Sequence, residues 1–419
     1  MASSTLTSAG ARLWTPARQG SFRLLWLGQS LSLLGDGFSY IAFSWITLGL
    51  TGSTLALGYV LAFQAVPRAL LTLVGGSLSD KWSSRTLMQF SSWARAGLMA
   101  AVGVAGMTGT LTLWLLCCAA AAFGAVDAFF QPARASILPS VVDKDLLAPA
   151  NALLGVGTKV SAILGPAVGG MVVAFSDAHV AFLVDAACFA LCGLFVSRIR
   201  TLPRETEPGT AAKATPAGED SLGARIKEGI RYALQDPRLR TILAIDVAVT
   251  FCQSGPFTVG FATLAKIDLQ GGSTTLGLLN GALAGGAMLG TLTGGALSAR
   301  PRVGLLISAL AGWLAIGTAL LGMVDHTASA LATVFAMGFG MGFQGVFGMS
   351  WIQRNIDGSV LSRVISFDMV LGYAVAPLSL VICGALAQQG TTPMFTLAAI
   401  ILAITSAAVL TSRHVREMR

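Results

Sequence analysis

The sequence predicts an all-α membrane protein with twelve transmembrane helices, arranged as two six-helix pseudo-repeats. The first observation is composition: 54% of the 419 residues are hydrophobic, 11% are charged, and the mean hydropathy is +0.74, which is too apolar for a soluble globular protein. The second is length, because the apolar runs match the roughly 20 residues that a membrane helix needs. The third is a repeat of short motifs between the two halves.

Twelve apolar spans are expected, punctuated by charged segments. None shows the alternation of a membrane β-barrel. Residues 1–21 contain no short apolar core followed by a cleavage site, so we expect no removable signal peptide. The spans are 22–49, 55–78, 87–107, 111–133, 149–174, 179–198, 240–264, 274–298, 303–324, 328–350, 361–388 and 392–411.

The basic residues predict the orientation of these spans. With a cytoplasmic N-terminus, the inner segments contain 23 of the 27 Lys and Arg residues, and the outer loops contain only Lys266. This asymmetry predicts a multi-pass protein of the inner (plasma) membrane with both termini in the cytoplasm. It also accounts for the net charge of +8, so no nucleic-acid partner is indicated.

The composition divides the chain into three regions. We expect an N-terminal six-helix bundle at 1–198, a cytoplasmic linker at 199–238 and a C-terminal six-helix bundle at 239–419. The linker begins with a stretch rich in Pro, Thr, Ala and charge, and continues into a basic amphipathic helix that most simply lies on the inner membrane surface. Docking to a partner is the alternative for this helix. A monomer is expected.

The two halves share short motifs at an offset of 219 residues. "TLALG" at 54–58 and "GGSLSDK" at 75–81 correspond to "STTLG" at 273–277 and "GGALSAR" at 294–300. Such internal repetition is typical of transporters whose substrate site lies near the membrane midplane.

Two motifs in these spans resemble those of the major facilitator superfamily. The loop after the second span is similar to the family's loop signature, although Ser83 stands where the family usually has Gly, and Ala299 replaces the acid in the second-half copy. The fifth span contains "SAILGPAVGG" at 161–170, which is similar to the signature of the family's antiporters. The matching residues are Gly76, Asp80, Lys81 and Arg85 in the loop, and Gly165, Pro166, Gly169 and Gly170 in the fifth span.

Longer phrases narrow the resemblance to the drug:proton antiporter branch, which includes macrolide and siderophore exporters. They are "FRLLWLGQSLSLLGDGFSYIAFSW", "VPRALLTLVGGSLSDK", "FFQPARASILPSVV" and "ANALL". The resemblance implies efflux by alternating access, driven by proton re-entry and needing no cofactor. A siderophore-type metabolite exporter or importer, and a non-transporting receptor or scaffold, remain alternatives.

Both motifs also have a purely physical interpretation. Lys81 and Arg85 hold their loop in the cytoplasm, whereas Asp80 is not needed for that and is available to a facing helix N-terminus as a gate contact. Small residues in the fifth span permit close helix packing, and Pro166 favours a bend. Packing alone is the alternative role for the fifth-span motif.

Ionisable groups at membrane depth are functional candidates by default. Asp36 in span one and Arg68 in span two lie at similar depths, so we expect them to meet and to form the proton-coupling site. A desolvated carboxylate holds its proton tightly, and a neighbouring Arg opposes this, so moving the Arg switches proton affinity. A permanent structural ion pair is the alternative.

Further acids lie within the spans. Asp127 and Arg134 are seven residues apart on one face of span four, and we expect a charge cluster near the inner gate that includes Arg85 or Arg95. A purely structural role is the preferred interpretation of this cluster. Asp246 is expected to face the cavity, whereas the sequence does not place Asp185 or Asp368.

The resemblance implies that spans one, four, seven and ten line the substrate path. Aromatic and apolar walls with a few amides suit a bulky amphipathic solute, although each aromatic residue has lipid contact or packing as an alternative role. The residues expected in the cavity are Phe38, Tyr40, Phe130, Asp246, Gln253, Phe257, Phe343 and Gln344.

Enzyme chemistry is not indicated. The three His residues lie in outer loops or the tail, so neither a metal cluster nor a catalytic triad is expected. The six Cys residues all fall within spans, which argues against a disulfide framework. No glycine-rich stretch continues into the Lys and Ser/Thr of a phosphate-binding loop, so ATP is not the expected energy source. The expected partners are a small-molecule substrate, protons and the lipid bilayer.

Overall fold

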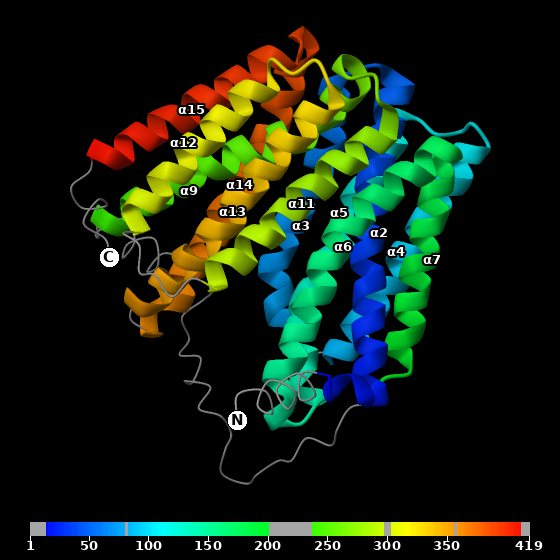
Figure 1. Ribbon diagram of the computed structural model, residues 1–419. Helices are drawn as coiled ribbons and strands as arrows, with labels where there is room; N and C mark the ends of the chain where they lie inside the picture. The colour runs from blue at the N-terminus through cyan, green and yellow to red at the C-terminus, as the bar shows by residue number, and fades with distance from the viewer. Residues whose placement is uncertain (1–13, 80–82, 201–236, 297–302, 356–357, 412–419) are drawn as a thin grey trace. The chain divides into compact units, whose positions relative to one another are not determined.

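The structure is a computed structural model that describes residues 14–79, 83–200, 237–296, 303–355 and 358–411. Within these residues it is almost entirely helical, and the twelve predicted spans each correspond to one long helical passage (Figure 1). The predicted linker at 199–238, with its amphipathic helix, lies almost entirely outside the described residues.

The first six passages are separated by short connections. A 3₁₀ turn, η1 (Pro16–Arg18), precedes them, and two more, η2 (Leu138–Ser140) and η3 (Lys144–Leu146), join the fourth to the fifth. The helices are α2 (Gly20–Thr51), α3 (Thr54–Ser79), α4 (Ser84–Met107), α5 (Leu113–Ile137), α6 (Leu147–Phe175) and α7 (Ala178–Ser197).

The next six begin with an irregular passage. It runs from α9 (Pro237–Gly255) through a π-helical segment η4 (Pro256–Gly260), the short α10 (Phe261–Thr263) and a second π-helical segment η5 (Leu264–Asp268). The remaining helices are α11 (Gly272–Ala296), α12 (Val303–Leu321), α13 (Thr327–Asn355), α14 (Gly358–Leu386), which continues into η6 (Ala387–Gln389), and α15 (Thr391–Thr411).

By length and apolar composition, eleven described helices are long and hydrophobic enough to cross a membrane, and α4 is the passage outside that set. Its polar residues explain the difference. Ser91, Ser92 and Arg95 are all fully buried, and α4 packs against α5 and α7. The polar face of α4 therefore points into protein, where these groups can be satisfied without contact with lipid.

Contacts divide the chain into two compact units. The first comprises Met1–Glu205 with Gly272–Gly281, and the second comprises Thr206–Gly271 with Ala282–Arg419. In the first unit, α2 packs against α6 and α7, and α3 packs against α5. In the second, α12 packs against α15 and α13, and α14 packs against α9.

Candidate functional site

Arg95 is the centre of a buried ion-pair cluster in the first unit. It comes from α4, and its side chain has no solvent exposure. Its Nη1 lies 3.3 Å from Asp36 Oδ1 and 3.0 Å from Asp127 Oδ1, and its Nη2 donates to Ser32 Oγ at 3.1 Å. One guanidinium therefore connects the carboxylates of α2 and α5, using the fixed fork geometry that distinguishes Arg from Lys.

Asp127 is shared between two arginines. Besides Arg95, it pairs with Arg68 of α3, whose Nε lies 3.1 Å from Asp127 Oδ2. The Asp127 side chain is almost fully buried, whereas that of Arg68 is 40% exposed. The ion pairs differ from the expected Asp36–Arg68 pair: Arg68 pairs with Asp127 and Asp36 pairs with Arg95, while Arg68 still acts electrostatically on Asp36. Similar depth along two helices did not determine which neighbour each side chain meets, because that also depends on rotation about the helix axes.

Two aromatic rings enclose the Arg95 guanidinium. Its Cζ lies 4.3 Å from the ring centroid of Phe130 and 4.3 Å from that of Phe189. Rings beside a planar cation provide cation–π attraction, while its N–H groups remain available for hydrogen bonds. Phe130 was expected to line the substrate cavity, but in this structure it is buried against Arg95.

The other predicted cluster members differ in their contacts. Arg134 is partly buried near Asp36 and Asp127, and its Nη1 has no hydrogen-bond partner among the described residues. Arg85 donates instead to the backbone at the end of α7, through Nε to Val196 O at 3.2 Å and through Nη2 to Ser197 O. A cation at a helix C-terminus is favourable because the last carbonyls lack intrahelical partners.

The gate motif is only partly described. Asp80 and Lys81 lie outside the described residues, and Gly76 lies in α3, where its surroundings are not described. Ser83, the departure from the family signature, is the N-cap of α4 and accepts from the Thr86 N–H at 3.1 Å. A Ser at this position therefore has its own structural role. The gate itself stays a prediction.

The fifth-span motif lies at a very close helix contact. A Cβ added to Gly37 of α2 would lie 2.7 Å from the carbonyl carbon of Gly165, so the two backbones touch without side chains between them. Phe38 of α2 covers Gly169.

On another side of α6, Ser273 Oγ donates to Gly170 O at 2.9 Å, and a Cβ on Gly277 would lie 2.4 Å from Pro166 O. Small residues here permit contact with both α2 and the first turns of α11.

The remaining cavity candidates are distributed over several helices. Tyr40 interacts with Ser44 and Asn280, and Asp246 accepts from Thr250 Oγ1 at 3.3 Å. The Phe257 ring stacks on Phe261. Phe343 lies between Phe339 and Phe347, and Gln253 and Gln344 are both partly buried. A common substrate cavity formed by these residues stays a prediction.

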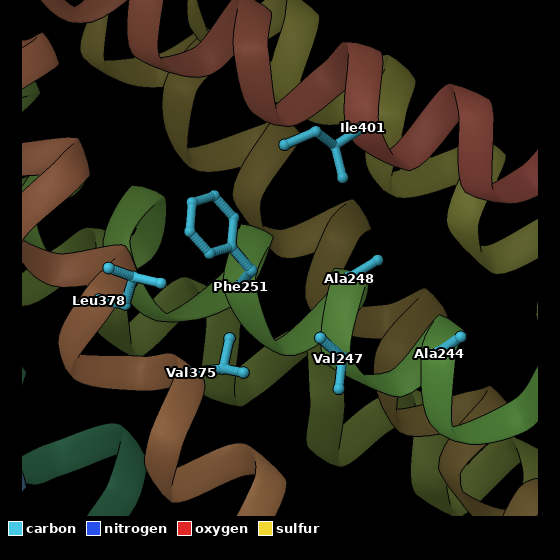
Figure 2. Close-up of a pocket in the computed structure, with 7 residues that line it drawn as sticks. All are labelled: Ala244, Val247, Ala248, Phe251, Val375, Leu378 and Ile401. Atoms are coloured by element: carbon cyan, nitrogen blue, oxygen red, sulfur yellow. The ribbon is translucent and has the colours of Figure 1, made fainter. Parts of the chain in front are cut away.

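A separate apolar recess lies in the second unit. It is an open recess of about 310 Å³ between α9, α14 and α15, and the labelled side chains in Figure 2 carry no polar group. Such a surface fits hydrocarbon. Its lining residues are Ala244, Val247, Ala248, Phe251, Val375, Leu378 and Ile401.

Sequence reasoning missed the central role of Arg95. A signal was present, because Arg95 lies in the middle of an apolar span where an unpaired cation is costly. The roles of Ser32, Ser39 and Phe189 had no comparable signal, since Ser and Phe are ordinary residues of membrane helices. Within the described residues no group of three or more His, Cys, Asp or Glu side chains is arranged to hold a metal ion.

Comparison with known proteins identifies the family. A family model described as Major Facilitator Superfamily matches residues 25–380. The chain belongs to the major facilitator superfamily. It is therefore a multi-pass membrane transporter rather than an enzyme, and small-molecule transport in a membrane is the activity of this family.

Similar members of the superfamily include efflux pumps. The chain is 26% identical to the multidrug efflux pump Tap of Mycobacterium tuberculosis over 379 residues, covering 88% of each chain. It is 21% identical to the uncharacterized MFS-type transporter YvqJ of Bacillus subtilis, covering 87% of this chain and 85% of that one.

A solved structure supports the same fold. The nucleoside transporter NupG superposes with a TM-score of 0.74 at 13% identity, covering 94% of this chain and all of that one. At this identity the match concerns the fold alone, and it agrees with the twelve-helix major facilitator architecture predicted from the sequence.

Proposed function

We propose that this major facilitator transporter exports a hydrophobic or amphipathic small molecule in exchange for protons, by alternating access. The observation that carries the proposal is the Asp36–Arg95–Asp127 cluster. Asp36 is 29% exposed, whereas Arg95 and Asp127 are almost completely buried. The cluster thus combines a partly exposed carboxylate with a buried cation that responds to its charge.

Proton uptake at Asp36 would change the forces on Arg95. An ionised Asp36 shares Nη1 of Arg95 with Asp127. Once Asp36 is protonated, its attraction for Arg95 weakens and Asp127 becomes the main anionic partner. Because α2, α4 and α5 carry these three groups, a proton can alter the balance of forces among three helices. Asp36 is therefore the proposed coupling residue, and Arg95 replaces Arg68 as its partner.

The substrate class has two supports. A relative that matches most of this chain is named a multidrug efflux pump. Spans assigned to the transport path also contain partly exposed aromatic and amide side chains, including Phe343 and Gln344, which suit an amphipathic solute. The proposal also includes a location in the plasma membrane with both termini in the cytoplasm. The proton gradient is its proposed energy source.

Reconstituted transport tests this function. Purified protein in proteoliposomes with an imposed pH gradient is offered ethidium, a macrolide and a siderophore in turn. We expect gradient-dependent accumulation of at least one of them by the wild type. Asp36→Asn should lose this accumulation while retaining exchange of substrate down its own gradient.

Asp177→Asn provides the matched control, because the Asp177 side chain is 70% exposed and lies just before α7, outside the cluster. This variant should behave as the wild type. If Asp36→Asn still concentrates substrate against its gradient, Asp36 is not the coupling residue. If the wild type shows no gradient-dependent flux with any probe, the antiport proposal fails for these substrate classes.

A further inference from the structure

Asp185 of α7 is a fully buried carboxyl that the proposed function does not use. Ser39 of α2 donates its hydroxyl to Oδ2. The other oxygen, Oδ1, has no hydrogen-bond partner among the described residues. It lies against Gly35, where an added Cβ would be 2.4 Å away, so glycine leaves the space that this oxygen occupies.

The charged groups around Asp185 are few. Asp36 of α2 and Arg95 of α4 act on it electrostatically, Cys188 is the titratable neighbour on its own helix, and Lys159, the charged residue of α6, is exposed. Arg95 already directs its two Nη atoms at Asp36, Asp127 and Ser32. In the described part of the chain, Asp185 therefore has a hydroxyl donor but no cation bonded to it, and an ionised carboxylate is strongly disfavoured in such a place.

Asp185 and Asp36 are nevertheless linked through one helix face. Ser32, Gly35, Asp36 and Ser39 recur at helical spacing on α2. Ser32 contacts Arg95, and Gly35 and Ser39 contact Asp185. A Cβ added to Gly35 would also lie 3.3 Å from the ring of Phe189, which contacts Arg95. The Nε of Arg95 is buried without a hydrogen-bond partner among the described residues. This N–H group is therefore available to donate a further hydrogen bond.

We propose that Asp185 is a second proton-binding site, protonated while Arg95 is paired with Asp36 and Asp127. When Asp36 takes up a proton, Arg95 is released from it and stabilises Asp185 as an anion, and Asp185 gives up its proton. One O–H bond forms at Asp36 and one breaks at Asp185, so the cluster keeps the same charge in both states. The exchange rests on the proposed coupling at Asp36, whereas the protonated state of Asp185 stands independently of it.

Infrared spectroscopy of the purified protein in lipid nanodiscs tests the site without substrate or gradient. The C=O stretch of a protonated carboxyl is separate from the bands of an ionised carboxylate. At neutral pH we expect such a band in the wild type and its loss in Asp185→Asn. Ser39→Ala should move the band to higher frequency, because the carbonyl loses its hydrogen bond. In Asp36→Asn the side chain at position 36 cannot carry a negative charge. Asp185 should then ionise more readily, so its band should disappear at lower pH than in the wild type.

Two controls separate this result from misfolding and from other acids. Asp246→Asn, in α9 of the second unit, should leave the band unchanged, and each variant must elute as one species of wild-type size. If Asp185→Asn misfolds, the frequency shift in Ser39→Ala decides the question. A band that neither Asp185→Asn nor Ser39→Ala alters, or no band at neutral pH, would overturn the proposal. A transport assay that fails while the band behaves as expected would reject the proposed function and leave Asp185 as a proton site.

Discussion

At the scale of residues, Arg95 determines how several acids coexist inside one bundle. It is fully buried, hydrogen-bonded to two carboxylates and one hydroxyl, and in cation–π contact with two aromatic rings. A buried ion pair gives little net stability relative to apolar packing, but the loss of one partner leaves an uncompensated charge. The cluster should therefore tolerate changes at its exposed edge far better than at its centre.

Replacing Arg95 should be the most damaging single change in this cluster. Arg95→Ala leaves Asp36 and Asp127 without their common partner, and loss of one member of a buried pair costs about 3–5 kcal/mol. Arg95→Lys should recover only part of this, because an ammonium lacks the planar fork and the stacking faces. Thermal unfolding in detergent, followed by size-exclusion chromatography, measures both variants.

Arg68→Ala is the matched comparison. Arg68 is 40% exposed and Asp127 keeps Arg95 as a partner, so this change should cost less than about 1 kcal/mol, as exposed pairs do. Equal losses at Arg68 and Arg95 would contradict the central role of Arg95.

At the scale of elements, helix contacts in this protein use glycine for close approach and hydroxyl groups that bond across helices. Gly37 and Gly165 bring α2 and α6 into backbone contact. In the second unit, Ser379 of α14 accepts from the Gly255 N–H at 2.9 Å and donates to Phe251 O at 2.5 Å. These are the backbone groups of residues four apart in α9, immediately before the π-helical segment at Pro256. A hydroxyl from another helix thus satisfies backbone groups where the regular helix ends.

Gly37→Ala should force α2 and α6 apart. Its new Cβ would meet the Gly165 backbone at 2.7 Å, and overpacking typically costs about 1–3 kcal/mol. Gly97→Ala in α4 is the control, because no other atom lies within 4 Å of an added Cβ there. The same thermal assay should show a lower unfolding temperature for Gly37→Ala than for the wild type, and an unchanged unfolding temperature for Gly97→Ala. An unchanged unfolding temperature for Gly37→Ala would contradict the close contact.

Ser379→Ala should destabilise the second unit by about 1–3 kcal/mol, because buried backbone groups lose their partner. Ser329→Ala is a suitable control: Ser329 is exposed and bonds only locally, to His326 O at 2.8 Å, so a change within about 0.5 kcal/mol is expected. Thermal unfolding of both variants provides the comparison. Equal effects of the two substitutions would show that the Ser379 hydroxyl has no special role in α9.

At the scale of the whole molecule, twelve helical passages and alternating connections imply a fixed topology. The short connection containing Thr110 joins α4 to α5, and that containing Asp143 joins α5 to α6, so they belong to opposite membrane faces. The distribution of basic residues predicts a cytoplasmic N-terminus. Thr110 should then face outward and Asp143 inward.

Cysteine labelling in intact cells tests this orientation. Thr110→Cys should react with a membrane-impermeant maleimide added outside, and Asp143→Cys should react only after permeabilisation, since both positions are exposed. The wild type, whose cysteines are buried except for Cys118, provides the background. The reverse pattern would place both termini outside and would overturn the predicted orientation.

Most of the fold was accessible from local sequence. The predicted spans 22–49 and 55–78 correspond to α2 (Gly20–Thr51) and α3 (Thr54–Ser79), because a bilayer demands a minimum apolar length and charge ends each run. The seventh passage was harder: the backbone immediately before its first π-helical segment is hydrogen-bonded to Ser379, which is more than one hundred residues away. The site was predicted in part, since Asp36, Asp127 and Arg68 belong to it, but their pairing was not.

The sequence by itself determined that the chain is a twelve-helix membrane protein of two repeats, and which acids lie at membrane depth. These properties depend on hydropathy and charge along the chain, which are local. Only the tertiary structure decided that Arg95 joins Asp36 to Asp127, that Phe130 and Phe189 cover it, and that Asp185 is buried beside Gly35 with Ser39 as its donor. Those contacts depend on which helices are neighbours and on how each is rotated about its axis, and a hydropathy pattern contains neither.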